Sequence, residues 1–400
     1  MQAYDVIVIG AGPAGIFTAL ELDKLMPQMR VLVVDSGSTI DNRSCPARTS
    51  SHCAHCRTCH IMNGWAGAGA FSDGKLSLSE EVGGNVTDYL PVQEVRDLIR
   101  YADDIYLKFG APDKVFGKSD KFAEQVSYEA HKHNIKLIPC PVRHMGTEYS
   151  FEVLREMYRY LSSREGFEYT KADTIEIENG RAVGVWLIGR DGERRLEKAR
   201  YIVAAPGRGG AEWLTSIARA NSLQTINNAV DIGVRVEVPN AVMDHLTKNL
   251  YEAKLVYYSD TFENKVRTFC MNPGGIVSEE HYEGGVGGKG IAVVNGHSYA
   301  DEDKHSENTN FAMLVSTKFT EPFNQPIEYG RYIAQLGNML TGGGIMVQRL
   351  GDLLMGRRTD KERLSKSTTV PTLKNAVPGD LSFVLPHRHL TSIVESLKAF

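Results

Sequence analysis

The chain has 400 residues, of which 42% are hydrophobic and 24% charged, and its formal net charge is -4. These values are ordinary for a globular protein and exclude a disordered or fibrous chain. The charge provides no general attraction for phosphate backbones, so we expect no nucleic-acid partner. No apolar run reaches the roughly 18 to 20 residues that a membrane-spanning helix needs, so we expect no membrane span.

The first 35 residues carry the pattern of a dinucleotide-binding fold. An apolar run at 6–9 leads into Gly-Ala-Gly-Pro-Ala-Gly at 10–15, a helical pattern follows, and a second apolar run at 31–34 ends in Asp35. In such a motif the glycines allow a tight turn, a close approach to pyrophosphate and helix packing, while the terminal acid receives ribose hydroxyls. We therefore expect a Rossmann-type domain whose ligand contacts come from Gly10, Gly12, Pro13, Ala14, Gly15 and Asp35. This motif fits both NAD and FAD.

Two later segments indicate further contacts with the same ligand. Residues 64–76 contain too many glycines for a regular element and too many apolar residues for a solvent loop, so we expect this backbone to lie against a ligand. Residues 201–204 are typical of a buried strand, which ends in a turn at Pro206 and Gly207. In the sequence between these two segments, the alternation of apolar and polar residues over 174–187 predicts a hairpin.

Taken together, these segments resemble the two-dinucleotide-binding-domain flavoproteins, and within them the NAD(P)/FAD-dependent dehydrogenases. The resemblance rests on residues 10–15, 67–76, 205–208, 231–237 and 269–275. It implies that the cofactor is FAD, that Gly67 and Gly69 lie beside its pyrophosphate or flavin, and that Gly207 belongs to the same site. It also implies an oxidoreductase that transfers hydride or electrons between flavin and a small-molecule substrate. The sequence has no second GxGxxG motif followed by an acid, which leaves a transient NAD(P)H or an electron-transfer partner as open alternatives for the second reactant.

The cysteines suggest a second centre. Cys45, Cys53, Cys56 and Cys59 lie within fifteen positions, at spacings that let a loop curl around one metal ion or cluster. Three interpretations stay open: a 4Fe-4S cluster, a structural zinc ion, or thiols without metal. A strand that begins near residue 4 leaves no room for a signal peptide, so we expect a cytoplasmic protein, in which such thiols stay reduced.

The predicted fold class is α/β, with a discontinuous Rossmann-type FAD-binding domain, a β-rich substrate or cap domain and a helical insertion. The predicted ranges are 1–80 and 146–215 for the FAD domain, 81–145 for the insertion and 216–335 for the cap. Residues 336–400 are expected to return towards the FAD domain, without the C-terminal FAD-binding element typical of such flavoproteins. Within the cap, residues 290–294 predict a strand that ends in a turn at Asn295 and Gly296.

Candidate catalytic residues are Lys75, Arg235 and His144. Lys75 follows the glycine-rich segment and could stabilise an anionic reduced flavin, although a surface lysine fits equally well. Arg235 shares one strand face with Asp231, Gly233 and Glu237, which either lines the substrate cavity or faces solvent. His144 could exchange a proton near neutral pH. Two other functions fit the same sequence: an NAD-dependent dehydrogenase, and a non-catalytic sensor that binds flavin or metal.

Overall fold

The structure is a computed structural model that describes residues 4–46, 56, 58–71, 73–118, 120–164, 166–282, 290–299 and 301–400. The chain forms two compact units. Unit 1 comprises Met1–Gly74, Tyr106–Ala111 and Thr147–Ile226, and unit 2 comprises Lys75–Ile105, Pro112–Gly146 and Asn227–Phe400. Within the described residues, no helix has the length and apolar character needed to cross a membrane.

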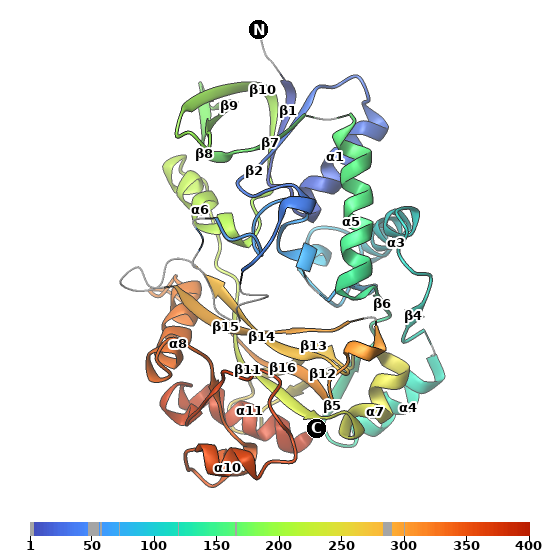
Figure 1. The fold of residues 1–400 in the computed structure, drawn as a ribbon, viewed down its shortest axis with the longest axis vertical. Coiled ribbons are helices and arrows are strands. Elements are labelled where there is room, and N and C mark those ends of the chain that lie inside the picture. The colour runs from blue at the N-terminus through green and yellow to red at the C-terminus, as the bar shows by residue number, and fades with distance from the viewer. Residues whose placement is uncertain are drawn as a thin grey trace. The chain divides into compact units, whose positions relative to one another are not determined.

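Unit 1 is built on a six-stranded sheet in the order β7-β2-β1-β10-β9-β8 (Figure 1). Its strands are β1 (Tyr4–Ile9), β2 (Val31–Asp35), β7 (Gly166–Tyr169), β8 (Lys171–Glu178), β9 (Arg181–Ile188) and β10 (Arg194–Ala204). Its helices are α1 (Pro13–Leu25), α5 (Gly146–Ser162), α6 (Ala211–Ala220) and the short 3-10 helices η1 (Ile40–Asn42), η2 (Gly67–Phe71) and η4 (Arg208–Gly210). Strands β7, β2, β1 and β10 run parallel, which confirms the predicted α/β class.

Strand β10 joins two kinds of pairing in one sheet. Its first half pairs antiparallel with β9, and its second half, from Ala199 to Ala204, pairs parallel with β1. The predicted hairpin is present as β8 and β9. Apolar side chains of β1, β2, β9 and β10, among them Ile7, Leu32 and Leu187, form the buried core of this unit. The sequence therefore brings the end of β10 beside the end of β1, where the glycine motif begins.

Unit 2 is built on an antiparallel five-stranded sheet in the order β11-β16-β13-β12-β5. The sheet strands are β11 (Val230–Pro239), β16 (Asn308–Thr317), β13 (Lys265–Asn272), β12 (Lys254–Tyr258) and β5 (Ile135–Ile138). The smaller strand groups are β14 (Ile276–Tyr282) with β15 (Ile291–His297), β3 (Lys75–Ser77) with β6 (Val142–His144) and β4 (Val115–Phe116), and β17 (Met346–Val347) with β18 (Val377–Pro378). The helices are α3 (Val92–Lys108, whose end from Tyr106 belongs to unit 1), α4 (Asp120–His131), α7 (Asn240–Leu250), α8 (Pro326–Leu340), α9 (Leu350–Leu354), α10 (Lys361–Ser365), α11 (His387–Ala399) and the 3-10 helices at Val86–Asp88, Glu302–Lys304 and Leu381–Phe383.

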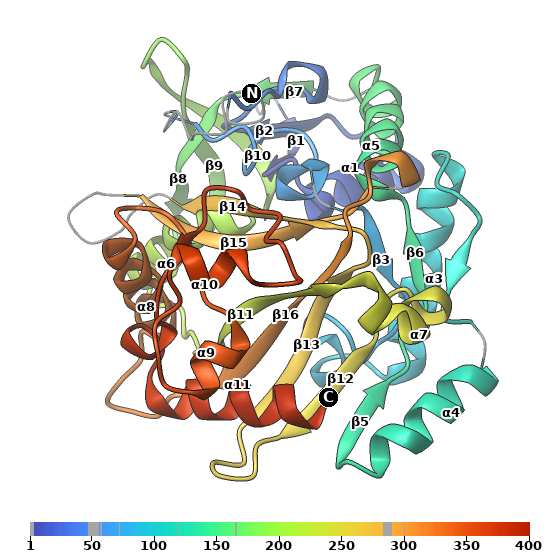
Figure 2. The ribbon, with the colours of Figure 1, turned by 60° about the horizontal axis from the view of Figure 1, so that its bottom comes forward.

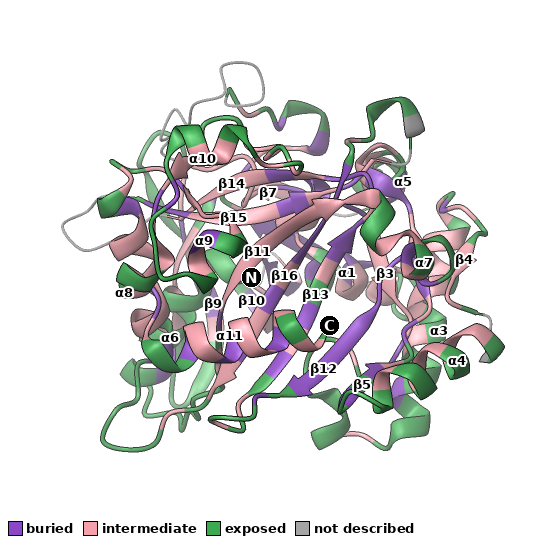
Figure 3. Ribbon diagram, turned by 90° about the horizontal axis from the view of Figure 1, so that it is seen from below, coloured by how far each residue is buried: buried purple, intermediate pink, exposed green. Residues whose placement is uncertain are grey.

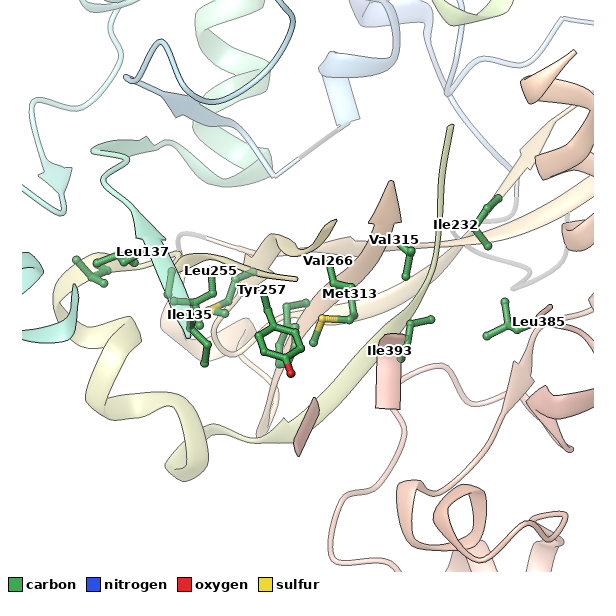
Figure 4. Close-up of a cluster of buried hydrophobic side chains, with 14 residues drawn as sticks. Ile135, Leu137, Ile232, Leu255, Tyr257, Val266, Met313, Val315, Leu385 and Ile393 are labelled. Carbon is green, nitrogen blue, oxygen red and sulfur yellow. The ribbon is translucent and has the colours of Figure 1, made fainter. Parts of the chain in front are cut away.

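The two faces of this sheet differ in chemistry. One face carries apolar residues that alternate along the strands, including Leu255, Val266 and Met313, and Figure 4 shows them gathered with Ile393 of α11. Helix α11 crosses this face beside β11, β16 and β13 (Figure 2), and the purple stretches of Figure 3 show buried residues along β12, β13 and β16. The residues between them in sequence point to the opposite face, because successive side chains of a strand alternate.

Three segments of unit 2 lie where the sequence analysis did not place them. Residues 81–145 contain α3 and α4 but also β5, which forms one edge of the five-stranded sheet. Residues 336–400 lie in unit 2 rather than with the nucleotide-binding sheet, because the apolar side of α11 packs on the core of unit 2. The predicted turn at Asn295 and Gly296 is wrong, since β15 continues through both residues to His297.

Candidate functional sites

The glycine motif of unit 1 connects the end of β1 to α1, and two of its glycines are required by the fold itself. Gly10 has a φ of +102°, and a Cβ built there would lie 2.1 Å from the carbonyl oxygen of Ala205. A Cβ on Gly15 would lie 1.9 Å from the carbonyl oxygen of Gly10. Both distances are far below van der Waals contact, so no other residue fits without moving the backbone.

Gly12 differs from these two glycines. Its φ is -77°, a value open to any residue, and the nearest atom to a built Cβ is the Cα of Gly67 at 3.9 Å. Gly67 has a φ of +56°, and its own Cβ would lie 3.2 Å from the Cα of Gly12. The two glycine segments predicted to contact a dinucleotide therefore present bare backbone side by side. The protein alone does not require glycine at position 12, whereas a pyrophosphate in contact with the backbone would.

The start of α1 fits a phosphate group. The helix begins at Pro13, its N-cap is Gly12, and neither a capping side chain nor an acidic residue occupies its first turn. The first N–H groups of a helix lack partners within the helix and carry the positive end of its dipole. Ala14 lies in that first turn, and Gly69 of η2 lies against Pro13, with its built Cβ 4.0 Å from the proline ring. Gly207, with a φ of +61°, forms the turn after β10.

Asp35 lies at the end of β2, as predicted, and it has a structural role that the sequence analysis missed. Its Oδ2 accepts a hydrogen bond of 2.9 Å from the N–H of Ala11. Its Oδ1 accepts from the N–H groups of Gly37 at 2.8 Å and Gly64 at 2.7 Å. A carboxylate offers about four acceptor positions, so three are used and about one remains for a ribose hydroxyl. Asp35 thus holds the two glycine segments together.

The cysteine cluster is described only in part. Cys45, Cys56 and Cys59 are free thiols, and Cys53 lies outside the described residues. Among the residues that the structure describes, no group of three or more histidine, cysteine, aspartate or glutamate side chains is arranged to hold a metal ion. A metal centre at these cysteines therefore stays a prediction from their spacing.

The three candidate catalytic residues all lie in unit 2, and the structure brings them into one cluster. Lys75 on β3 has a nearly buried side chain whose Nζ donates to the carbonyl oxygen of Met271 at 2.9 Å and to Asn272 Oδ1 at 3.1 Å. It also forms an ion pair of 3.3 Å with Glu252. The alternative of a surface lysine is therefore excluded, because the nearly buried Lys75 side chain has polar partners inside the unit.

His144 is the register partner of Lys75 on the adjacent strand β6. Its Nε2 lies 2.8 Å from the hydroxyl of Tyr251 and 3.0 Å from Oγ of Ser298. The imidazole also stacks on the Tyr251 ring, with 4.2 Å between the ring centres. A ring nitrogen in contact with two hydroxyls accepts a hydrogen bond when it is unprotonated and donates one when it is protonated, so it can exchange a proton with either hydroxyl.

Arg235 lies on the polar face of the five-stranded sheet. Its Nε donates to Asn310 Oδ1 at 2.8 Å, and its NH2 donates to the carbonyl oxygen of Cys270 at 2.7 Å. A Cβ on Gly296 of β15 would lie only 1.8 Å from this NH2. Glycine at position 296 therefore serves a close approach within a strand, which is why the Asn-Gly pair does not mark a turn. Strand β15 lies against this guanidinium, so the solvent-facing alternative does not hold for Arg235.

The cluster also includes polar residues that the sequence analysis did not select. They are Tyr251, Glu252, Lys254, Cys270, Asn272, Ser298 and Asn310, of which all but Cys270 are buried. Cys270 has a φ of +48° and lies at an irregularity where the pairing of β13 with β16 shifts between Phe269 and Asn272. The sequence does contain one signal for this polar face, the pair Asn308 and Asn310. Polar residues at alternate positions of a strand lie on the same face, opposite the apolar core. We call this set, with Lys75, His144 and Arg235, the polar cluster.

Glu252 is the carboxylate at the centre of the polar cluster. It is 3% exposed and pairs with Lys254 at 2.5 Å as well as with Lys75. Burial acts to raise the pKa of Glu252, but the charges of Lys75 and Lys254 and two hydrogen bonds oppose it, so the net pKa is lowered. The carboxyl is therefore ionised at neutral pH and balances one of the two lysines.

A comparison with known protein families gives a match over the C-terminal part of unit 2, which contributes residues to the polar cluster. Residues 229–400 match the family described as "FAD-dependent protein, C-terminal domain-like". An uncharacterised protein of Clostridium beijerinckii is 26% identical over 370 residues, which are 89% of this chain and 60% of that protein. The chain thus spans less than two thirds of the length of this relative.

Solved structures show partial likeness with low identity. The FAD complex of glycerol-3-phosphate dehydrogenase from Bacillus halodurans is 12% identical with a TM-score of 0.35, covering 84% of this chain and 52% of that one. Glycine oxidase from Bacillus cereus is 14% identical with a TM-score of 0.34, covering 82% and 76%.

The family match begins one residue before β11 and extends to the end of the chain, so it covers the long contiguous part of unit 2. It includes Arg235, Glu252, Cys270 and Asn310 of the polar cluster. The predicted resemblance to FAD-dependent proteins is therefore supported over this part of the chain, which matches the family model without covering half of the sequence.

Proposed function

We propose that the chain is an FAD-dependent oxidoreductase that binds FAD at the glycine segments of unit 1 and a small-molecule substrate at the polar cluster of unit 2. The observation that carries the proposal is the pairing of Gly12 with Gly67 before the uncapped start of α1. This arrangement leaves bare backbone and N–H groups where a pyrophosphate binds in dinucleotide-binding folds. The family match of residues 229–400 supports FAD over NAD.

The residues of each unit would contribute distinct steps. Bound FAD supplies the exchange of hydride or electrons. In unit 1, the first turn of α1 would bind the pyrophosphate, and Asp35 would keep the two glycine segments in place. In unit 2, His144 would exchange a proton with a substrate through the hydroxyl of Tyr251 or Ser298, and Lys75 would keep Glu252 ionised.

The absorption spectrum of the purified protein, recorded anaerobically before and after dithionite, tests the cofactor. We expect flavin bands near full occupancy, which bleach on reduction, and FAD rather than FMN released on denaturation. A colourless protein that stays colourless after incubation with FAD would contradict the proposal. Such a protein that instead binds NAD would support the NAD-dependent alternative.

The cysteines are tested on the same sample. We propose that Cys45, Cys53, Cys56 and Cys59 hold an iron–sulfur cluster or a zinc ion, on the basis of their spacing alone. Iron with acid-labile sulfide, at a stoichiometric ratio to protein, is the expected result for a cluster, and zinc without sulfide is the result for a structural ion. Absence of iron, zinc and sulfide after anaerobic purification would remove the metal centre.

A further inference from the structure

We propose that Arg235 binds the carboxylate group of the substrate, so that the substrate class is small organic carboxylic acids. This inference rests on the proposed function, because it assigns the specificity of the same polar cluster. It is carried by the charge balance of the cluster and by the way Arg235 is held.

The cluster has more positive than negative charge. Within the described residues it contains Lys75, Lys254 and Arg235 against the single carboxylate of Glu252. Both lysines pair with Glu252, at 3.3 Å and 2.5 Å from its oxygens. The side chains of Lys75, Lys254 and Glu252 are at most 8% exposed, so water screens their charges poorly. An anion would therefore be stabilised beside this group.

Arg235 lacks the acidic partner that a neighbouring arginine has. Its described acceptors are the amide oxygen of Asn310, which is neutral, and the carbonyl oxygen and sulfur of Cys270, so none of them is a carboxylate. Arg267, which also lies on the polar face, pairs with Asp231 at 2.6 Å. Among the described residues, the second terminal nitrogen of Arg235, NH1, has no hydrogen-bond partner, so this end of the guanidinium is available to a ligand.

The guanidinium is also fixed in orientation before a ligand arrives. Asn310 is fully buried, and its Oδ1 accepts from both Arg235 Nε and Asn272 Nδ2. Its own Nδ2 is a buried donor without a partner in the described part of the chain. On the other side, the backbone of Gly296 prevents the guanidinium from turning. A planar donor held in this way suits a planar carboxylate, because little side-chain freedom is lost on binding.

Binding of simple carboxylates to the full-length protein tests the inference without turnover. Acetate, butyrate and benzoate are compared with acetamide, butyramide and benzamide by ligand-detected NMR at constant ionic strength. We expect at least one carboxylate to bind at least tenfold more tightly than its amide, and Arg235→Gln to lower its affinity at least tenfold. Arg267→Gln is the matched control, and we expect less than a twofold change.

A second variant separates charge from folding. Asn310→Asp keeps the size and the acceptor for Arg235 Nε but adds a carboxylate beside the guanidinium, so it should weaken carboxylate binding at least tenfold. Equal binding of each acid and its amide, or unchanged binding in folded Arg235→Gln and Asn310→Asp, would overturn the inference. Arg235-dependent binding of sulfate or phosphate in preference to all carboxylates would overturn the substrate class. The binding assay does not depend on flavin. A negative result would therefore contradict the carboxylate site without bearing on FAD binding, which the absorption spectrum tests.

Discussion

Replacement of Gly12 by valine is expected to lower FAD affinity at least 100-fold, which corresponds to about 2.7 kcal/mol or more. The side chain would occupy the space where the pyrophosphate contacts bare backbone. The protein itself should tolerate the change, because φ at this position is ordinary and the nearest atom to a built Cβ lies 3.9 Å away. Flavin content after purification and titration of the apoprotein with FAD measure the effect, and Gly12→Ala should give an intermediate loss.

A contrast within the same motif separates ligand binding from folding. Gly15→Ala places a Cβ 1.9 Å from the carbonyl oxygen of Gly10, so this variant should lose stability as well as flavin. The thermal unfolding of Gly12→Val apoprotein should match that of wild-type apoprotein, whereas Gly15→Ala should unfold at a lower temperature. Full flavin occupancy in Gly12→Val would show that the cofactor lies elsewhere.

Replacement of Glu252 by glutamine is expected to lower the free energy of unfolding by about 3–5 kcal/mol, the cost of removing one partner from a buried ion pair. The substitution leaves Lys75 and Lys254 charged and nearly buried without a carboxylate. Urea unfolding followed by circular dichroism measures the loss. The control is Glu129→Gln, which removes an exposed helical pair with Lys132 and should change stability by less than about 0.5 kcal/mol.

The effect of Glu252 should depend on pH in a defined direction. The pKa of Glu252 is lowered in the folded protein, so the unfolded chain binds a proton more readily than the folded one. The stabilisation is therefore complete above the ordinary glutamate pKa and decreases as pH falls through the lowered value. The difference between wild type and Glu252→Gln should shrink with acidification in this range. A difference that stays constant from neutral to acidic pH would contradict this account of the cluster.

The local elements of unit 1 were accessible from sequence because their signals are continuous in the chain. The strand, the glycine motif and α1 occupy residues 4–25 without interruption, and β8 and β9 pair across a short turn. The role of Asp35 was only partly accessible. Its position at the end of β2 follows from the pattern, but its bond to Gly64 depends on a segment 29 residues away.

The polar cluster shows why the rest could not be predicted. Lys75 and His144 were selected separately, and nothing in either sequence context indicates that they face each other across β3 and β6. Glu252 precedes β12 and Lys254 begins it, and nothing in this local sequence indicates that both charges are buried, with Glu252 paired to Lys75 and Lys254. The charged residues of the polar cluster come from distant parts of unit 2. No short stretch of the sequence therefore indicates that their charges lie close together.

The hydrogen bonds of Asp35 have an evolutionary consequence. One oxygen of this carboxylate accepts hydrogen bonds from the N–H groups of both Gly37 and Gly64. The two ends of the segment between these glycines are therefore held at the same atom. The entropic cost of closing such a loop rises only slowly with its length. The buried side chain of Arg43 also donates to the carbonyl oxygens of His60, Ile61 and Trp65, so we expect insertions and deletions only between Arg43 and His60, where they leave the glycine segments in place. We expect relatives of this chain to gain or lose the cysteine motif as a unit while the rest of the nucleotide-binding fold stays unchanged.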